Sequence, residues 1–262
     1  MTAGRFGHPG RPMTPGMPEI ARWAGLAVVL AGAGAAVVLL ERRRRWWVRE
    51  LTNRIPAHHV HWRERGRARD GSLLYVALGD SAALGLGARR PETGYVGILA
   101  DAVAARTGRH VRVRNLAIDG ATLGVVLRDE LGRLEGLEPD LVTLGIGAND
   151  IWTFDPERFR SEYTRICDAL PPGTLVAELP SFSVLPVARR ARAANRIIHE
   201  VAEAHGFWVA PLYAMTGVGG VVDAVLGAAG DRFHPNDRGH RRWADAFLPG
   251  VLARIRSGSA AP

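Results

Sequence analysis

The sequence contains no lysine and a single cysteine, Cys167. One cysteine excludes a disulfide within the chain and any metal site built from several thiolates. Cys167 lies in a stretch with a helical pattern, residues 156–170, where we expect it to be a small buried side chain. The chain has no lysine and is at the same time rich in alanine, glycine, valine and arginine. We interpret it as a compositional bias and not as a functional signal.

The excess of positive charge is confined to one end of the chain. Residues 1–70 contain 13 arginines against 5 acidic residues, which accounts for the whole net charge of +8. Residues 71–262 carry 21 arginines and 21 acidic residues and are neutral overall. Because the neutral part also has no nucleic-acid-binding signature, we expect no nucleic-acid partner. With 47% hydrophobic residues in the chain, a sizeable core is expected.

A long uncharged run, WAGLAVVLAGAGAAVVLL, occupies residues 23–40. As a helix it would span about 27 Å at about 1.5 Å per residue, close to the thickness of the hydrocarbon core of a bilayer. Tryptophans near both ends of the run fit interfacial anchors, and the four arginines at 42–45 would lie among lipid headgroups. We therefore predict a single N-terminal transmembrane helix at 23–40, with a cleaved signal peptide as the alternative.

The segments on either side of this run are expected to lack a fold. Residues 1–22 predict a disordered tail, and residues 41–70 predict a basic, solvated juxtamembrane linker. The linker histidines have no acid or cysteine at zinc-site spacing, so we expect no metal there; they are His58, His59 and His61. More arginines follow the apolar run than precede it. The positive-inside rule then favours a single-pass protein with a cytoplasmic domain, and the extracytoplasmic side stays open.

From residue 71 onward, short apolar runs alternate with longer helical patterns. Strands are predicted at 73–78, 111–116, 141–144, 175–178 and 208–210. Helices are predicted at 94–107, 123–134, 156–170, 187–205 and 237–255. Continuous apolar strands separated by helices indicate an α/β domain with a parallel sheet covered on both faces. We place this domain at residues 71–257, followed by a short C-terminal tail at 258–262.

Residues whose side chains or backbone could take part in catalysis follow the predicted strands. The first strand runs into Ser81, the second leads to Gly120, and the third leads to Asn149. Asp231 and His234 follow the fifth strand after a long loop. Because ligands of such sheets bind at the carboxyl ends of the strands, we expect these residues to meet along one rim.

These residue types suit acyl transfer. A serine hydroxyl becomes a good nucleophile when a histidine removes its proton, and a carboxylate holds that histidine in the required tautomer. An accessible glycine N–H, an asparagine amide and the N–H of the serine itself can stabilise the oxyanion that forms. This chemistry requires no metal and no organic cofactor.

Four sequence blocks resemble, in the same order, those of the SGNH or GDSL-type esterase/lipase family. They are Gly79–Ser81, Gly120 within NLAIDGAT, Gly147–Asp150, and Asp231–Pro235. The resemblance covers residues 73–255 and implies a flavodoxin-like three-layer α/β/α fold with a five-stranded parallel sheet. It does not extend to the N-terminal segment.

The resemblance also implies a role for each residue of these blocks. Ser81 would be the nucleophile, His234 the base, and Asp231 the carboxylate that orients the base. Ser81, Gly120 and Asn149 would form the oxyanion hole. The expected activity is hydrolysis of a small-molecule or lipid-like acyl ester.

Several nearby residues are expected to have structural roles only. The Gly-x-Ser-x-Gly motif is absent because position 83 is alanine, which argues against the standard α/β-hydrolase elbow. A second Asp-x-x-His pair, Asp237 and His240, falls inside the last predicted helix, so His240 is expected at the surface or in packing. We expect Asp80 and Asp150 to hold their loops through backbone N–H groups.

Two points stay open from the sequence alone. Residues 214–230, apolar and rich in glycine, form either a flexible lid or acyl-binding wall, or a loose helix packed on the sheet. Besides ester hydrolysis, an acyltransferase with the same serine chemistry and a non-catalytic binding protein on the same fold remain alternatives.

Overall fold

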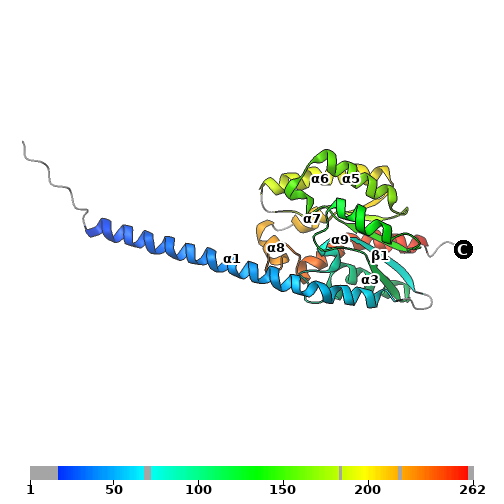
Figure 1. Cartoon of the computed structure of the whole chain (residues 1–262), viewed down its shortest axis with the longest axis horizontal. Coiled ribbons are helices and arrows are strands. Elements are labelled where there is room, and N and C mark those ends of the chain that lie inside the picture. Colours follow the sequence, from blue (N-terminus) through cyan, green and yellow to red (C-terminus); the bar gives the residue numbers. More distant parts are fainter. Residues whose placement is uncertain (1–16, 68–71, 183–184, 218–219, 259–262) are drawn as a thin grey trace, which may run out of the picture. The chain divides into compact units, whose positions relative to one another are not determined.

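A computed structural model describes residues 17–67, 72–182, 185–217 and 220–258 (Figure 1). Five parallel strands form one sheet in the order β2-β1-β3-β4-β5. They are β1 (Leu73–Gly79), β2 (Val111–Asn115), β3 (Leu141–Gly145), β4 (Leu175–Ala177) and β5 (Trp208–Ala210). This is the flavodoxin-like order, and it confirms the predicted α/β fold with its five-stranded parallel sheet.

The sheet is built from the apolar runs that the sequence marks. Every residue of β1 is buried, as expected for the central region of a parallel sheet covered on both faces. Its register pairs Leu73 with Val111 on one side and Tyr75 with Leu141 on the other. The carboxyl ends of β1 and β3 therefore lie side by side.

Helices cover both faces of the sheet and give the three-layer arrangement (Figure 1). On one face α3 (Tyr95–Thr107) and α9 (Asp237–Gly258) bury residues such as Tyr95 and Phe247. On the other face α5 (Pro156–Ala169) and α6 (Leu185–Ala204) bury a second apolar cluster. Cys167 of α5 is buried in that second cluster, as predicted.

Short elements connect these layers, most of them near the carboxyl ends of the strands. They are α2 (Ser81–Leu84), η1 (Pro91–Thr93), α4 (Leu123–Val125), η2 (Val126–Glu130), η3 (Leu131–Arg133), η4 (Asp150–Thr153), α7 (Leu212–Gly217) and α8 (Gly220–Gly227). The predicted helix at 123–134 is thus divided into α4, η2 and η3. Its middle part, η2, has the wider π-helical winding, and Glu130 at its end is fully buried.

The N-terminal helix α1 (Met17–Arg65) differs from the prediction. Among the described residues, no helical stretch combines the length and the hydropathy that a bilayer crossing needs, so the transmembrane helix predicted at 23–40 is not supported. Several side chains of that run, at 24–25 and 27–29, lie outside the described residues. The helix also begins within the predicted tail and continues beyond residue 40 through the four arginines. The rest of the predicted tails, at 1–16 and 259–262, lies outside the described residues.

The chain divides into two compact units at Arg45 and Trp46. The second unit contains the whole sheet and the part of α1 from Trp46 onward. In this part Leu51 and Trp62 are buried in the apolar cluster beneath α3 and α9. The solvated linker predicted at 41–70 is therefore wrong over residues 46–65. The prediction gave weight to the arginines and overlooked apolar side chains that recur at helical spacing.

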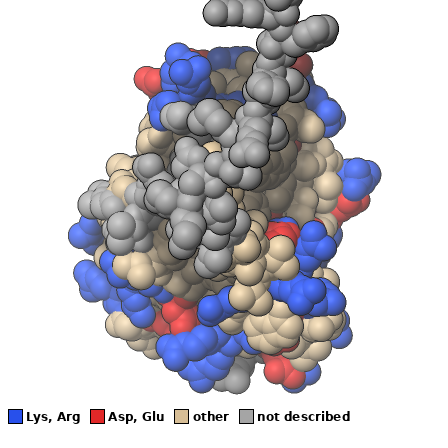
Figure 2. All heavy atoms as spheres, turned by 90° about the vertical axis from the view of Figure 1, so that its left-hand side faces the viewer, with Lys and Arg blue, Asp and Glu red and all other residues tan. Residues whose placement is uncertain are grey.

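Basic side chains are interspersed with acidic ones on the surface. Figure 2 shows them in several separate groups around the visible face, often beside an acidic residue. Ion pairs in the domain include Arg128–Asp129, Arg158–Glu162 and Arg65–Asp101. The first two pairs lie within residues 71–262, whose positive and negative charges balance.

Candidate active site

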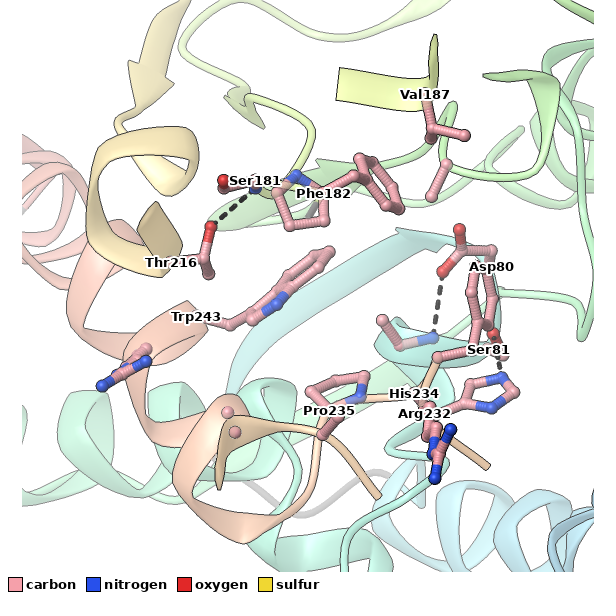
Figure 3. A pocket seen from close by; sticks show the side chains of 18 of the residues that line it. Asp80, Ser81, Ser181, Phe182, Val187, Thr216, Arg232, His234, Pro235 and Trp243 are labelled. Atoms are coloured by element: carbon pink, nitrogen blue, oxygen red, sulfur yellow. Dashed lines mark hydrogen bonds between the residues drawn. The ribbon is translucent and has the colours of Figure 1, made fainter. Parts of the chain in front are cut away.

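Ser81 is the first residue of α2, directly after the carboxyl end of β1. Asp80 caps this helix, because its Oδ1 accepts a hydrogen bond of 2.9 Å from the backbone N–H of Ala82. The chain therefore turns sharply at the strand end and leaves the Ser81 hydroxyl at the edge of a cavity (Figure 3).

His234 and Asp231 meet Ser81 from the opposite end of the domain sequence. Nε2 of His234 lies 2.9 Å from Oγ of Ser81, and Nδ1 lies 2.5 Å from Oδ2 of Asp231. The other oxygen of Asp231 accepts backbone N–H groups of Phe233 and His234. Figure 3 shows the imidazole beside the serine. Three residues of the predicted site are thus joined in one hydrogen-bonded chain.

The protonation state of Asp231 follows from its surroundings. Burial alone would raise its pKa, but the hydrogen bond from His234, the charge of that imidazole and two backbone N–H groups together lower the pKa below its ordinary value. Asp231 is therefore an anion at neutral pH. An anion at Nδ1 keeps the proton on that nitrogen and leaves Nε2 able to accept one from Ser81.

A glycine allows the loop that follows α2 to approach the backbone at His234 and Pro235. Gly87, six residues after Ser81, has φ of +91°, and a Cβ there would lie 2.2 Å from the carbonyl oxygen of Pro235. It would also lie 3.0 Å from Cβ of His234. Any larger residue would push the two loops apart, so glycine at 87 is required for the observed approach.

Asn149 links the loops that carry the other two predicted residues. Its Nδ2 donates to the carbonyl oxygen of Ala121 at 2.8 Å and lies 3.5 Å from Oδ2 of Asp80. Ala121 follows Gly120, which is exposed with φ of +69° and open space beside it. Neither Gly120 nor Asn149 is among the residues that line the cavity. The structure therefore brings Asn149 next to both loops but does not join Gly120 to Ser81 by a contact.

The two acidic residues of these loops hold backbone, as predicted. Asp80 caps α2, and both carboxylate oxygens of Asp150 lie 3.3 Å from the backbone N–H of Leu123. Burial raises the pKa of each carboxyl to about 6. Through these backbone contacts they stabilise the loops around the site.

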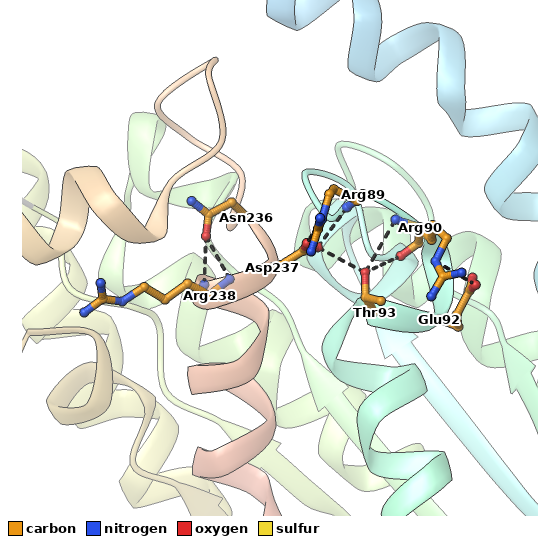
Figure 4. A network of polar contacts seen from close by, with 8 residues as sticks. Arg89, Arg90, Glu92, Thr93, Asn236, Asp237 and Arg238 are labelled. Carbon is orange, nitrogen blue, oxygen red and sulfur yellow. Dashed lines mark hydrogen bonds and ion pairs between the residues drawn. The ribbon is translucent and has the colours of Figure 1, made fainter.

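The second Asp-x-x-His pair is structural. Asp237 accepts hydrogen bonds from the backbone of Arg89 and the hydroxyl of Thr93, and it also pairs with the Arg89 side chain (Figure 4). His240 is fully buried, with Nε2 2.9 Å from the carbonyl oxygen of Leu86. Burial lowers the pKa of His240 to about 4, so it is a neutral packing residue. This confirms the role expected for it.

The cavity beside Ser81 has a volume of about 260 Å³ and is mostly apolar. The lining side chains that sequence reasoning missed include Trp152, Phe182, Val187, Arg232, Phe233 and Trp243. Three of these are close to motif residues in the sequence, which was the one available signal: Arg232 and Phe233 lie between Asp231 and His234, and Trp152 lies two residues after Asp150. Segment 214–230 contributes Thr216, Gly227 and Ala228 to the wall, and residues 218–219 within it lie outside the described residues.

Another residue without a sequence signal is Glu130. Its Oε2 accepts the backbone N–H of Gly79 at 2.9 Å, two residues before Ser81. Its Oε1 is buried without a hydrogen-bond partner among the described residues. Burial raises the pKa of this carboxyl to about 8, so it is largely protonated at neutral pH. Glu130 thus supports the end of β1 from the face opposite α3.

Solved structures of similar fold include several hydrolases. LAE5, an α/β hydrolase enzyme from the metagenome of Lake Arreo in Spain, is 25% identical with a TM-score of 0.56, over 70% of this chain and 96% of that one. The psychrotrophic esterase EstA from Pseudoalteromonas sp. is 24% identical with a TM-score of 0.55, over 70% and 98%. Phospholipase A1 from Streptomyces albidoflavus NA297 is 20% identical with a TM-score of 0.53, over 70% and 100%.

The sequence itself carries the family assignment. No curated protein matches the chain significantly, and the structural similarities below 25% identity show the fold alone. Residues 77–242, however, match the sequence profile of one family over more than half of the chain. The matched range includes Ser81, Asn149 and His234. The chain therefore belongs to the GDSL-like lipase/acylhydrolase family.

Proposed function

We propose that this protein is a serine ester hydrolase that works through an acyl-enzyme on Ser81. The observation that carries the proposal is the chain of contacts from Asp231 through His234 to Oγ of Ser81, with distances of 2.5 and 2.9 Å. A hydroxyl within hydrogen-bond reach of an imidazole, itself oriented by a carboxylate, is the arrangement that activates serine for acyl transfer.

In the first half of the reaction Oγ of Ser81 attacks the ester carbonyl while Nε2 of His234 takes the hydroxyl proton. The C–O bond to the alcohol then breaks, and His234 returns the proton to the leaving oxygen. Asp231 stabilises the imidazolium that exists between these two steps. The alcohol departs and the acyl group stays on Ser81.

In the second half, water replaces the alcohol. His234 removes a proton from water, which attacks the acyl carbonyl, and the acid leaves as the Ser81 hydroxyl re-forms. In both halves the carbonyl oxygen becomes an oxyanion. We assign its donors as the backbone N–H groups of Ser81 and Gly120 and the amide of Asn149. Nδ2 of that amide donates to the carbonyl oxygen of Ala121 at 2.8 Å and makes a longer contact of 3.5 Å with Oδ2 of Asp80, which we expect the oxyanion to replace.

The cavity supports a hydrophobic acyl group as substrate. Phe182, Val187 and Phe233 face the space beside the Ser81 hydroxyl. A volume of about 260 Å³ lies just below the range of about 300–1,000 Å³ that is usual for drug-sized ligands. Acyl chains of short to medium length are therefore expected to react fastest.

A series of p-nitrophenyl esters from acetate to palmitate tests this function. We expect kcat/KM to be highest for short or medium chains, and Ser81→Ala and His234→Ala to lower kcat by about 10³-fold or more. Product analysis with an added alcohol separates transfer from hydrolysis. Wild-type kcat in folded Ser81→Ala, or a folded wild-type protein that cleaves none of the esters, would contradict the proposal.

A further inference from the structure

Residues 46–65 of α1, the docked segment, face the domain along one side. Its inward positions recur at helical spacing and are Trp47, Leu51, His58, Trp62 and Arg65. Leu51, His58 and Trp62 are buried, whereas the neighbouring Val48 and Val60 are exposed. The docked segment belongs to the same compact unit as the active site but lies outside the range that matches the family.

The docked segment caps the C-terminal end of α2, the helix that begins with Ser81. The carbonyl oxygen of Leu84, the last residue of α2, accepts hydrogen bonds from Nδ1 of His58 at 2.8 Å and Nε1 of Trp62 at 2.9 Å. The last carbonyl groups of a helix have no partner within the helix and need an outside donor. Burial lowers the pKa of His58, so the ring is neutral at physiological pH with its proton on Nδ1.

The same segment touches the loop that carries the acid and the base. The indole of Trp47 lies against Gly230, where a Cβ would come 2.0 Å from Nε1. Gly230 directly precedes Asp231, so Trp47 packs on the backbone that leads to the Asp231–His234 pair. Any side chain at 230 would displace Trp47.

Two further contacts fix the segment in place. Nδ1 of His61 lies 3.8 Å from a carboxylate oxygen of Glu92 in η1, and Arg65 bonds to Asp101 of α3 at 3.0 Å. Figure 4 shows the loop of Arg90 and Glu92 beside the blue helix α1. The docked segment is therefore in contact, at its ends and in its middle, with α2, η1, α3 and the loop before Asp231.

We propose that the docked segment positions the active site. Trp47, His58 and Trp62 are its positioning residues, and they keep α2, which carries Ser81, and the Asp231–His234 loop at a fixed distance from each other. This inference rests on the proposed ester hydrolase function. The 2.9 Å contact between Ser81 and His234 joins two separate loops, and the docked segment contacts both. A misplacement of about 1 Å in reacting groups can lower a rate by about 10²-fold.

The test compares variants of the full-length chain after the concentration of active sites is titrated with a fluorophosphonate. Trp47→Ala is paired with Val48→Ala, and His58→Ala is paired with His59→Ala, because the controls alter exposed neighbours on the same helix. Trp62→Phe keeps an aromatic side chain at this buried position and removes the indole N–H donor together with part of the ring. The readouts are kcat per titrated site, KM and Tm.

We expect Trp47→Ala and His58→Ala to lower kcat per titrated site by about 10- to 100-fold, and Trp62→Phe by about threefold to tenfold, with KM within about twofold. The two controls should stay within twofold of wild type. A lower Tm with unchanged kcat per titrated site would overturn the inference, because it would show stabilisation alone. A wild-type protein that takes no label and cleaves no ester would overturn the proposed function first, and this inference with it.

Discussion

At the residue scale, the carboxylate of Asp231 holds His234 at two points, the imidazole Nδ1 and the backbone N–H of His234. Asp231→Asn keeps the shape of the side chain and its contacts with the backbone, but it replaces the carboxylate anion beside Nδ1 of His234 by a neutral amide. The amide N–H then favours the tautomer with the proton on Nε2, which cannot accept from Ser81. We expect kcat to fall by about 10³- to 10⁴-fold with little change in KM. Steady-state kinetics with a p-nitrophenyl ester check this, and a loss below tenfold would show that Asp231 has no such role.

Glu130 gives a prediction about pH and stability. Its pKa is raised from the ordinary value of 4.5 to about 8 by burial, so between these values the folded chain binds one proton that the unfolded chain releases. The free energy of unfolding therefore falls as pH rises from about 4.5 to about 8, by on the order of 1.4 kcal/mol per pH unit from this group alone. Glu130→Gln, which cannot ionise, should abolish that slope.

Chemical denaturation at pH 5, 7 and 9 measures this effect. The Glu130→Gln variant should gain stability over wild type as pH rises, because only the wild type must bury a charge there. Glu135→Gln makes the same change at an exposed position and serves as the control. Equal differences between Glu130→Gln and wild type at all three pH values would contradict the raised pKa.

At the element scale, two helices are capped by aspartate in the same way. Asp80 caps α2 beside Ser81, and Asp155 caps α5 by accepting the backbone N–H groups of Glu157 and Arg158. Replacing either by alanine should cost about 1 kcal/mol of stability. Only Asp80→Ala should also lower kcat, by about tenfold, since only α2 carries the nucleophile. Equal kcat in the two variants would show that this cap does not position Ser81.

The elements that the sequence predicts well are those with a continuous signal. All five strands lie within one residue of their predicted ends, because buried parallel strands are uninterrupted apolar runs. The helix expected at 123–134 is divided, and Glu130 at the end of its π-helical part accepts a hydrogen bond from the backbone of Gly79, a long-range contact with no periodic signal in the sequence. The docked segment was missed because its inward side chains are spread among arginines and histidines.

At the scale of the whole molecule, the site was predictable where topology determines it. Parallel strands place their carboxyl ends on one edge, so residues after β1 and β3 had to be neighbours, and the four blocks identified which ones. The cavity wall was not predictable, since Trp152, Phe182 and Phe233 come from separate loops and meet only after the chain folds. Contacts between such loops leave no periodic signal in the sequence.

Covalent labelling of Ser81 is the decisive test of whether His234 activates this serine as a nucleophile. Wild-type protein is treated with a fluorophosphonate, its intact mass is measured, and the modified peptide is sequenced by mass spectrometry. We expect one adduct per chain, located on Ser81, and at least a 100-fold slower reaction in His234→Ala. A folded wild-type protein that remains unlabelled, or an adduct on a different serine, would contradict it.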